Sequence, residues 1–360
     1  MTYSCFASCS FGLESVTSSE LKRLGMQDVK ASDARVYFSA DALGIAEANL
    51  HLRTADRVYI ELYRFTAKTF DELFEGVRAI SWEDYIPKNA TFPVDADSVK
   101  SALFSVSDIQ SISKKAIVDR LMSKHKTSVL PETGFRVNVH IKILADQVSA
   151  CLNVSGAGLN RRGYRAASVA APIRETLAAG LVLLSGWRGG ALADPMCGSG
   201  TIAIEAAMIG AGIAPGLNRA FDGESWRIFS GEWQRAREEA ASSKKRECEV
   251  FASDIDKKAL AAADRNAAAA GVSLRVFHAD VRDFHRQNTL VLTNPPYAQR
   301  IGDKDQVHRL YRDMGKALSV AQRKYIITAD ESFERWFGKR ARKRRKLYNG
   351  NIRCTFFQYF

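Results

Sequence analysis

Short apolar runs, each closed by a polar side chain, recur through the second half of the chain. Four of them occupy residues 191–193, 250–253, 274–279 and 290–293, and they end in Asp194, Asp254, Asp280 and Asn294. Runs of this length and composition predict buried strands. Because open parallel sheets gather their ligands at the carboxyl ends of the strands, we expect the four polar groups to share one edge. A helix N-cap would explain any one of them, but not all four.

Amphipathic stretches separate these runs and predict helices at 171–187, 202–209, 257–270, 307–318 and 333–337. A further strand is expected at 325–328. Asn349-Gly350, inside the segment 347–357, is typical of a hairpin turn, so the sheet should contain one antiparallel strand. Residues 213–249, with two tryptophans and many charges, interrupt the alternation and suggest a two-layer insertion. The second half is therefore predicted to be an α/β domain.

The first half of the chain has the pattern of an α+β protein. Strands are expected at 3–11, 35–38, 58–62, 91–94, 135–144 and 147–154, the last two joined by a turn at Ala145-Asp146. Helical spacing is found at 13–24, 45–50, 70–77 and 109–121. The last of these helices carries a row of basic residues. The first fifty residues alone suggest a small α/β unit of their own.

A glycine-rich turn at 194–201 joins one strand to the helix that follows it. Gly198, Gly200 and Ala203 match the Ala-ended form of the dinucleotide fingerprint, so a dehydrogenase has to be considered. Such an enzyme usually places its ribose-binding acid about 20 residues after the turn. Here one acid precedes the turn, at Asp194, and the next strand-end acid, Asp254, comes 60 residues after Asp194. This spacing favours a nucleoside of the S-adenosylmethionine kind. Asp254 would accept hydrogen bonds from its ribose hydroxyls, and Asp280 would accept one from its adenine amine.

Asn294-Pro295-Pro296-Tyr297 ends the last of the four runs. Proline has no N–H and restricts the residue before it, so the strand should stop in a rigid polar turn. The turn offers two hydrogen-bond acceptors and one aromatic face, which suits a planar base bearing an amino group. An ordinary loop after a strand is an equal alternative at this point.

Charge and composition indicate which class of binding partner to expect. The net charge is +12 over 360 residues, and residues 338–346 hold seven positive charges and no negative one. A basic surplus attracts nucleic acid, although a charged run is as often a solvated face. Residues 155–165 combine three glycines, three arginines and a tyrosine, which suits either phosphate and base contacts or a basic linker. The predicted phosphate contacts are Lys114, Lys115, Arg161, Arg162, Arg165, Lys339, Arg340, Arg342, Lys343 and Arg344.

Several classes of protein are disfavoured. No apolar run approaches the roughly 18 residues of a membrane span, and the N-terminus has no secretory pattern. The six cysteines form no Cys-x-x-Cys pair and the histidines are scattered, so we expect no metal site. Reduced thiols in a cytoplasmic protein are the simplest interpretation.

The chain resembles the THUMP-domain class I S-adenosylmethionine-dependent RNA methyltransferases, in particular the bacterial group that methylates the exocyclic amine of a guanine in large-subunit ribosomal RNA. The resemblance extends over the whole length. It implies a ferredoxin-like unit at 1–52, a THUMP RNA-binding domain at 53–155, a basic linker at 156–170 and a Rossmann-like catalytic domain at 171–360. It is carried by segments 52–58, 69–74, 82–87, 155–159, 162–165, 194–201, 294–297 and 346–350.

The resemblance also implies roles for individual residues. S-adenosylmethionine would be the cofactor, RNA the partner, and Asn294, Pro295, Pro296 and Tyr297 would form the catalytic turn that holds the target base. Transfer RNA guanine-N2 methylation and DNA adenine-N6 methylation stay open as alternatives. The implied cofactor-binding residues are Asp194, Met196, Cys197, Gly198, Ser199, Gly200, Thr201, Asp254, Ile255, Asp280 and Val281.

Overall fold

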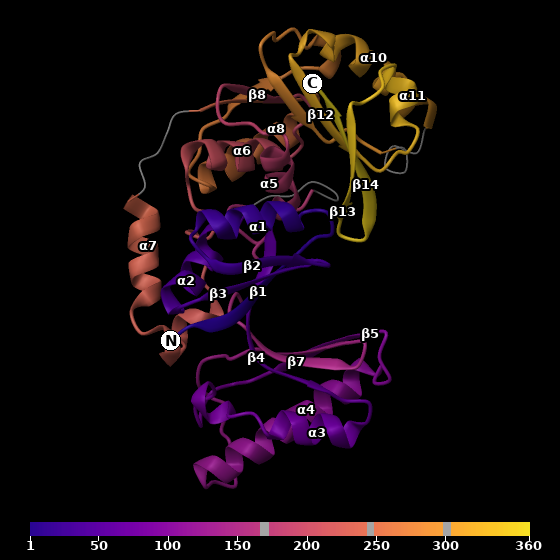
Figure 1. The fold of residues 1–360 in the computed structure, drawn as a ribbon. Coiled ribbons are helices and arrows are strands. Elements are labelled where there is room, and N and C mark those ends of the chain that lie inside the picture. The colour runs from indigo at the N-terminus through magenta and orange to yellow at the C-terminus, as the bar shows by residue number, and fades with distance from the viewer. Residues whose placement is uncertain (166–172, 243–247, 298–303) are drawn as a thin grey trace.

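A computed structural model describes residues 1–165, 173–242, 248–297 and 304–360, and within them the chain forms two seven-stranded sheets. Figure 1 shows the N-terminal half, in indigo and purple, below the C-terminal half, in orange and yellow. No helix of the described part is long and apolar enough to cross a membrane. The predicted combination of an α+β first half and an α/β second half is confirmed.

The first sheet runs through the whole N-terminal half. In spatial order its strands are β2 (Gln27–Ser32), β3 (Arg35–Ala40), β1 (Tyr3–Cys9), β4 (Ala55–Thr66), β7 (Gln147–Asn153), β6 (Val139–Leu144) and β5 (Val94–Val99).

Strand β4 joins the two units that the sequence suggested. Its first part, residues 55–60, pairs antiparallel with β1, and its second part, residues 59–66, pairs with β7. The small unit expected at the N-terminus therefore does not close on itself, because β4 continues its sheet into the next unit. The sequence prediction also missed β2 altogether and placed β5 too early, since Thr91 makes only an isolated bridge to Arg136.

Four helices belong to this half: α1 (Glu14–Arg23), α2 (Ala42–His51), α3 (Phe70–Arg78) and α4 (Val106–His125), with the short η1 (Trp82–Asp84). Two of them begin at side-chain caps. Asp41 accepts a hydrogen bond from Gly44 N at the start of α2, and Thr69 and Glu72 form a capping box on α3. Such caps satisfy backbone donors that the helix itself leaves unpaired.

The second sheet has the order β10 (Arg275–His278), β9 (Glu249–Asp254), β8 (Ala191–Asp194), β11 (Leu290–Thr293), β12 (Arg323–Thr328), β14 (Ile352–Tyr359) and β13 (Lys343–Asn349). Neighbouring strands from β10 to β12 are parallel, and β14 is antiparallel to both of its neighbours. The predicted hairpin and its single antiparallel strand are confirmed.

Alternate residues of the central strands face opposite sides of this sheet. Leu290 and Leu292 join one apolar cluster with α5 (Glu175–Leu184), α6 (Thr201–Ala211) and α8 (Lys257–Ala269), whereas Val291 joins another with α10 (Lys304–Ala317) and α11 (Phe333–Phe337). Short helices η4 (Val281–Asp283) and η5 (Leu318–Val320) flank α10. A sheet covered on both faces explains why its central strands β8 and β11 are apolar, whereas the edge strands β10 and β13 carry charged and exposed residues.

The insertion between α6 and β9 packs against the first half. It forms η2 (Asp222–Ser225), η3 (Arg227–Phe229) and α7 (Glu232–Ser242), and α7 lies along α2 (Figure 1). Trp226, Phe229 and Trp233 are buried in the core of the N-terminal half. The two-layer insertion predicted from the sequence is wrong for the described residues, because its aromatic side chains complete a core that the first sheet already provides.

Candidate active site

The four polar strand ends belong to adjacent strands. β10, β9, β8 and β11 are neighbours and run parallel, so Asp280, Asp254, Asp194 and Asn294 follow one edge of the sheet. Thr293 Oγ1 donates to Asp194 Oδ1 at 2.7 Å and links the ends of β11 and β8. The edge is therefore held together by side chains as well as by strand pairing.

Asp194 is buried behind this edge, with 1% of its surface exposed. Burial, together with the nearby Asp254 carboxylate, raises the pKa of its carboxyl to about 7, although hydrogen bonds from Thr293 and from Met196 N oppose the shift. Met196 N lies 3.4 Å from Asp194 Oδ1. A carboxyl in such a place changes its charge readily when a cation approaches.

The glycine-rich turn leads from β8 into α6 and is tied to β9. Gly198 N donates to Asp254 Oδ2 at 2.9 Å, and Cys197 N donates to Ser253 O at 3.0 Å. Gly198 and Gly200 have φ of +54° and +83°, which favour glycine. A Cβ on Gly200 would also lie 2.9 Å from the Cβ of Ala263 on α8, so the turn needs glycine there for two reasons.

A cavity of about 240 Å³ opens in front of the turn. Asp254 and Asp280 supply its carboxylates, and its walls are mostly apolar. Ile255 is 67% exposed although it is large and hydrophobic, which packing within the chain does not explain. The cavity is lined by Pro195, Met196, Asp254, Ile255, Asp280, Val281, Arg282, Pro296, Gln306 and Leu310.

The carboxylate acceptors and the apolar walls of this cavity fit an adenosine. Carboxylate oxygens accept from ribose hydroxyls and from an adenine amine, and apolar side chains suit the faces of the base. Asp280 also accepts from Arg282 N at 2.9 Å as the N-cap of η4, so its capping and binding roles are compatible. Among the predicted cofactor residues, Cys197, Ser199, Gly200 and Thr201 are buried in the turn behind the cavity.

The Asn294-Pro295-Pro296-Tyr297 turn forms one border of the cavity through Pro296. Tyr297 Oη donates to Asn294 Oδ1 at 2.8 Å and lies 3.7 Å from Cys354 Sγ on β14. The Tyr297 ring is 5% exposed in this conformation, so its contact with a target base stays a prediction. What the structure adds is a hydrogen bond that fixes the Asn294 carboxamide.

Sequence reasoning missed Tyr311, which holds the same turn from α10. Its Oη donates to Pro296 O at 3.0 Å and lies 3.4 Å from Thr328 Oγ1 at the end of β12. Burial raises the pKa of Tyr311 to about 12, so its hydroxyl stays protonated and able to donate. The only signal in the sequence was a tyrosine on the apolar face of an amphipathic helix.

The structure corrects one predicted RNA contact, Arg162. This residue is 3% exposed, and its guanidinium binds Glu205 Oε1 at 3.3 Å and Leu159 O at 2.7 Å. Arg165 also has partners within the chain, because its guanidinium forms an ion pair with Glu175 at 2.6 Å and donates to Thr201 Oγ1. The neighbouring Arg161 is exposed. The arginines of this segment therefore serve mostly to join the two halves of the chain.

The other predicted RNA contacts also divide into basic side chains that are paired within the chain and side chains that are exposed. Lys114 binds Glu132 at 2.7 Å and lies 3.3 Å from the centroid of the Phe92 ring, whereas Lys115 is exposed. Arg344 binds Glu334 at 2.6 Å. Lys339, Arg340, Arg342 and Lys343 are exposed near and along the edge strand β13, where charge also prevents pairing between sheets.

Cysteines and histidines add no further site. The six thiols are free, and five of them are buried. In the described ranges, no group of three or more His, Cys, Asp or Glu side chains could hold a metal ion.

The parallel sheet with its acid-lined edge, the glycine-rich turn and the adenosine-sized cavity define a Rossmann-like class I methyltransferase. Family models support this and extend it. Residues 162–358, more than half of the chain, match the RMKL-like methyltransferase domain, residues 4–59 match the RlmL ferredoxin-like domain, and residues 67–152 match the THUMP domain. The chain therefore belongs to the RMKL-like methyltransferase family, and the resemblance drawn from its sequence is confirmed.

Two known proteins are similar to this chain over nearly its full length. The "Putative RNA methyltransferase YpsC" of Bacillus subtilis is 43% identical over 370 residues, covering 99% of this chain and 96% of that protein. The "Ribosomal RNA large subunit methyltransferase K/L" of Syntrophotalea carbinolica is 34% identical over 379 residues, covering 98% of this chain. The chain spans about half of the K/L protein, 53% of its length.

A solved structure identifies the cofactor. The putative methyltransferase SMU.472, complexed with SAH (S-adenosylhomocysteine), has a TM-score of 0.93 and 38% identity, and the match covers 100% of this chain and 98% of that one. The cofactor of this chain is S-adenosylmethionine.

Proposed function

We propose that the protein transfers a methyl group from S-adenosylmethionine to the exocyclic N2 amine of a guanine in large-subunit ribosomal RNA. The observation that carries the proposal is the Asn294-Pro295-Pro296-Tyr297 turn at the rim of the adenosine-sized cavity. A THUMP domain in the same chain and the ribosomal substrate named for the K/L relatives support RNA as the carrier of that base.

The chemistry required of the protein is positioning. S-adenosylmethionine supplies a methyl group that is already activated on a sulfonium. A guanine amine is a poor nucleophile because its lone pair is delocalised into the ring. In the proposed step, Asn294 Oδ1 and the Pro295 carbonyl each accept one amine hydrogen, so the nitrogen can pyramidalise and direct its lone pair at the methyl carbon. The bond from the methyl carbon to sulfur breaks as its bond to nitrogen forms, and the nitrogen then releases one proton to solvent.

The contacts around the turn suit this task. Tyr297 Oη donates to one lone pair of Asn294 Oδ1, which fixes the carboxamide and leaves the second lone pair for the amine. Tyr311 fixes the Pro296 carbonyl from the other side. Because groups held in place need no reorganisation during the reaction, such a turn contributes through orientation and through exclusion of water. A stacked base must first leave its helix, at a cost of about a few kcal/mol.

The central test is Asn294→Ala. We expect methyl transfer to RNA to fall by at least about 100-fold, the scale on which loss of a positioned hydrogen-bonding group acts, while S-adenosylmethionine binding by calorimetry stays nearly unchanged. Asn294→Asp is the matched control of shape, since it keeps both the acceptor oxygen and the bond from Tyr297. Equal loss of binding and turnover in Asn294→Ala would make the residue structural and refute its proposed role.

The substrate is tested by mass spectrometry of modified nucleosides. RNA fractions from a strain lacking the gene should lose N2-methylguanosine at one position, and the purified protein should restore it. Restoration in the ribosomal large-subunit fraction supports the proposal. Methylation of transfer RNA, or of adenine in DNA, would instead select one of the alternatives that share the catalytic turn.

A further inference from the structure

A fifth strand contributes an acid to the same edge of the sheet. β12 runs parallel to β11, and Asp330 follows it by two residues. Asp330 N donates to Thr328 Oγ1 at 3.1 Å, and Thr328 in turn lies beside the Tyr311 hydroxyl that holds Pro296. A chain of hydrogen bonds therefore connects Asp330 to the catalytic turn.

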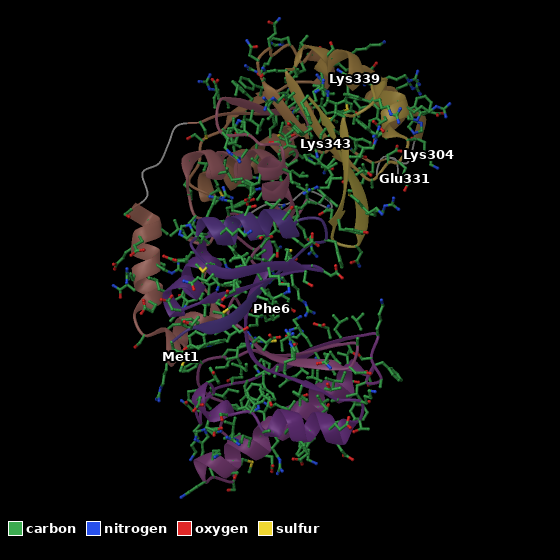
Figure 2. All side chains as sticks on the ribbon, viewed as in Figure 1. Met1, Phe6, Lys304, Glu331, Lys339 and Lys343 are labelled. Atoms are coloured by element: carbon green, nitrogen blue, oxygen red, sulfur yellow. The ribbon has the colours of Figure 1, made fainter. Side chains whose placement is uncertain are left out.

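Asp330 lines a second cavity, of about 290 Å³. The catalytic turn borders both cavities, because Pro296 lines the cofactor cavity and Tyr297 lines this one. Figure 2 labels two residues of the second cavity, Lys304 on α10 and Glu331 after β12, and shows them close together. The full lining is Tyr297, Lys304, His308, Ala329, Asp330, Glu331 and Ser332.

The Asp330 carboxylate is held in a fixed orientation. Its Oδ1 accepts from Ser332 N at 2.8 Å and from Ser332 Oγ at 2.7 Å, and its Oδ2 lies 3.6 Å from His308 Nε2. The His308 ring is itself stacked on Trp336, with centroids 4.4 Å apart. Only 13% of the Asp330 side chain is exposed, compared with 81% for Glu331, which lies near Arg353. One carboxylate is thus built into the cavity wall and its neighbour is not.

A fixed acceptor beside the amine site distinguishes between the bases. Guanine, adenine and cytosine all carry an exocyclic amine, but guanine alone has a ring N–H next to it, since the adjacent ring nitrogen of the other two is an acceptor. A carboxylate attracts the guanine N1–H and repels the lone pair of the others. A cation such as Lys304 matches the guanine O6, the next group along the same edge.

We propose that this cavity holds the target base and that Asp330 selects guanine by accepting the hydrogen bond from its ring N1–H. The inference rests on the proposed function and names the specificity-determining residue of the same site. A hydrogen bond to a charged group typically gives about 10- to 100-fold discrimination, and more when the wrong base leaves the charge unpaired.

The test uses a synthetic RNA fragment that carries the guanine mapped by the nucleoside analysis. In a second fragment 2-aminopurine replaces this guanine, which keeps the 2-amine but presents a lone pair at N1. The kcat/KM of the wild-type protein should be at least about 10-fold higher for the guanine fragment than for the 2-aminopurine fragment. In Asp330→Asn the amide can donate to N1 of 2-aminopurine while its oxygen still accepts from Ser332. We expect the ratio of the two kcat/KM values to fall about 10-fold or more in this variant.

Asp33→Asn is the matched control, because it makes the same substitution at an exposed carboxylate that lines neither cavity. Its ratio should stay at the wild-type value. Binding of S-adenosylmethionine by calorimetry verifies that each variant is folded. An unchanged ratio in Asp330→Asn overturns the inference and leaves the proposed function intact.

Wild-type protein alone provides a second, independent measurement. A fragment with 1-methylguanine at the target keeps the amine and O6 but lacks the N1–H, so it should be methylated at least about 10-fold more slowly than the guanine fragment. Equal rates on these two fragments would overturn the inference even if Asp330→Asn failed to fold. If the wild-type protein leaves N2 of the guanine fragment unmethylated, the proposed function fails first, which is a different result.

Discussion

Cofactor binding should depend on the ionisation of Asp194. Its carboxyl is buried behind the glycine-rich turn, and burial raises its pKa to about 7. The family resemblance implies that this residue lies near the amino acid part of S-adenosylmethionine, which carries an ammonium group, and this position stays a prediction. A neutral carboxyl attracts an ammonium much less than a carboxylate does, so we predict that the cofactor binds the ionised form of Asp194 and that its affinity falls as the pH is lowered.

The size of the effect follows from the pKa. When only the ionised form binds, the apparent Kd rises about tenfold for each pH unit below the pKa. At pH 5.5, which is about 1.5 units below a pKa of about 7, the affinity should be roughly 30-fold weaker than at pH 8. The ammonium of the ligand also titrates near pH 8, so the comparison has to separate the two groups.

The assay is calorimetric titration of the wild-type protein and Asp194→Asn with S-adenosylmethionine between pH 5.5 and 8. Asparagine keeps the oxygen that accepts from Thr293 but removes the negative charge and with it the titration. Its affinity should be lower overall and should lack the 30-fold slope, while any contribution from the ligand remains in both proteins. Thr293→Val, which removes the hydrogen bond that opposes the shift, should move the wild-type profile to higher pH.

The stability of the free protein should depend on Asp194 in the opposite direction, because it falls as the pH rises whereas cofactor affinity increases. Because the folded pKa lies above the ordinary aspartate value of 3.8, the contribution of Asp194 to stability is fully present below about pH 4 and is lost as the pH rises to about 7. The loss is at most about 4 kcal/mol, since each pKa unit corresponds to about 1.4 kcal/mol. Asp194→Asn should therefore gain stability over wild type between these pH values. Superimposable pH profiles of wild type and Asp194→Asn, for binding and for unfolding, would refute the reasoning.

Three further outcomes are expected. Arg161→Ala should weaken RNA binding and flatten its salt dependence without changing stability, whereas Arg162→Ala should cost about 3–5 kcal/mol in urea unfolding because it removes the ion-pair partner of the buried Glu205 carboxylate. In filter binding, Lys115→Ala should weaken RNA binding more than Lys114→Ala, whose side chain is already paired; the reverse order would contradict this. Gly200→Ala should lower the melting temperature and abolish cofactor binding, since its φ of +83° and a contact at 2.9 Å both exclude a Cβ.

The acid-lined edge could be predicted from the sequence because its signal is local. A short apolar run followed directly by an acid or amide is visible in Asp194, Asp254 and Asn294. The order of these strands in the sheet was not predicted and comes from the structure. Asp330 has the same signal, displaced by one residue, since Ala329 separates it from Thr328. A rule that allowed one intervening residue would have found it.

Long-range contacts left no such signal. Seven positive charges at 338–346 suggested an exposed run, yet part of it is an edge strand, and Arg344 pairs with Glu334 ten residues earlier. Arg162 looked like its neighbour Arg161, because its partner Glu205 lies 43 residues away on α6. Composition reports the charge of a segment, whereas the partner of each charge depends on the fold.

The joint between the two halves gives these buried charges a function beyond stability. Arg162 binds Glu205 of α6 and, through another guanidinium nitrogen, Leu159 O, while Arg53 Nη2 donates to Ile213 O at 2.7 Å across the same joint. Trp226 and Trp233 anchor the insertion of the catalytic half in the core of the other. Buried ion pairs add little net stability, and in some proteins they instead specify one arrangement of the parts that they join. If the THUMP domain holds RNA, a fixed arrangement would set which nucleotide reaches Asn294. We therefore infer that the joint selects the position of the target, as the second cavity is proposed to select its base.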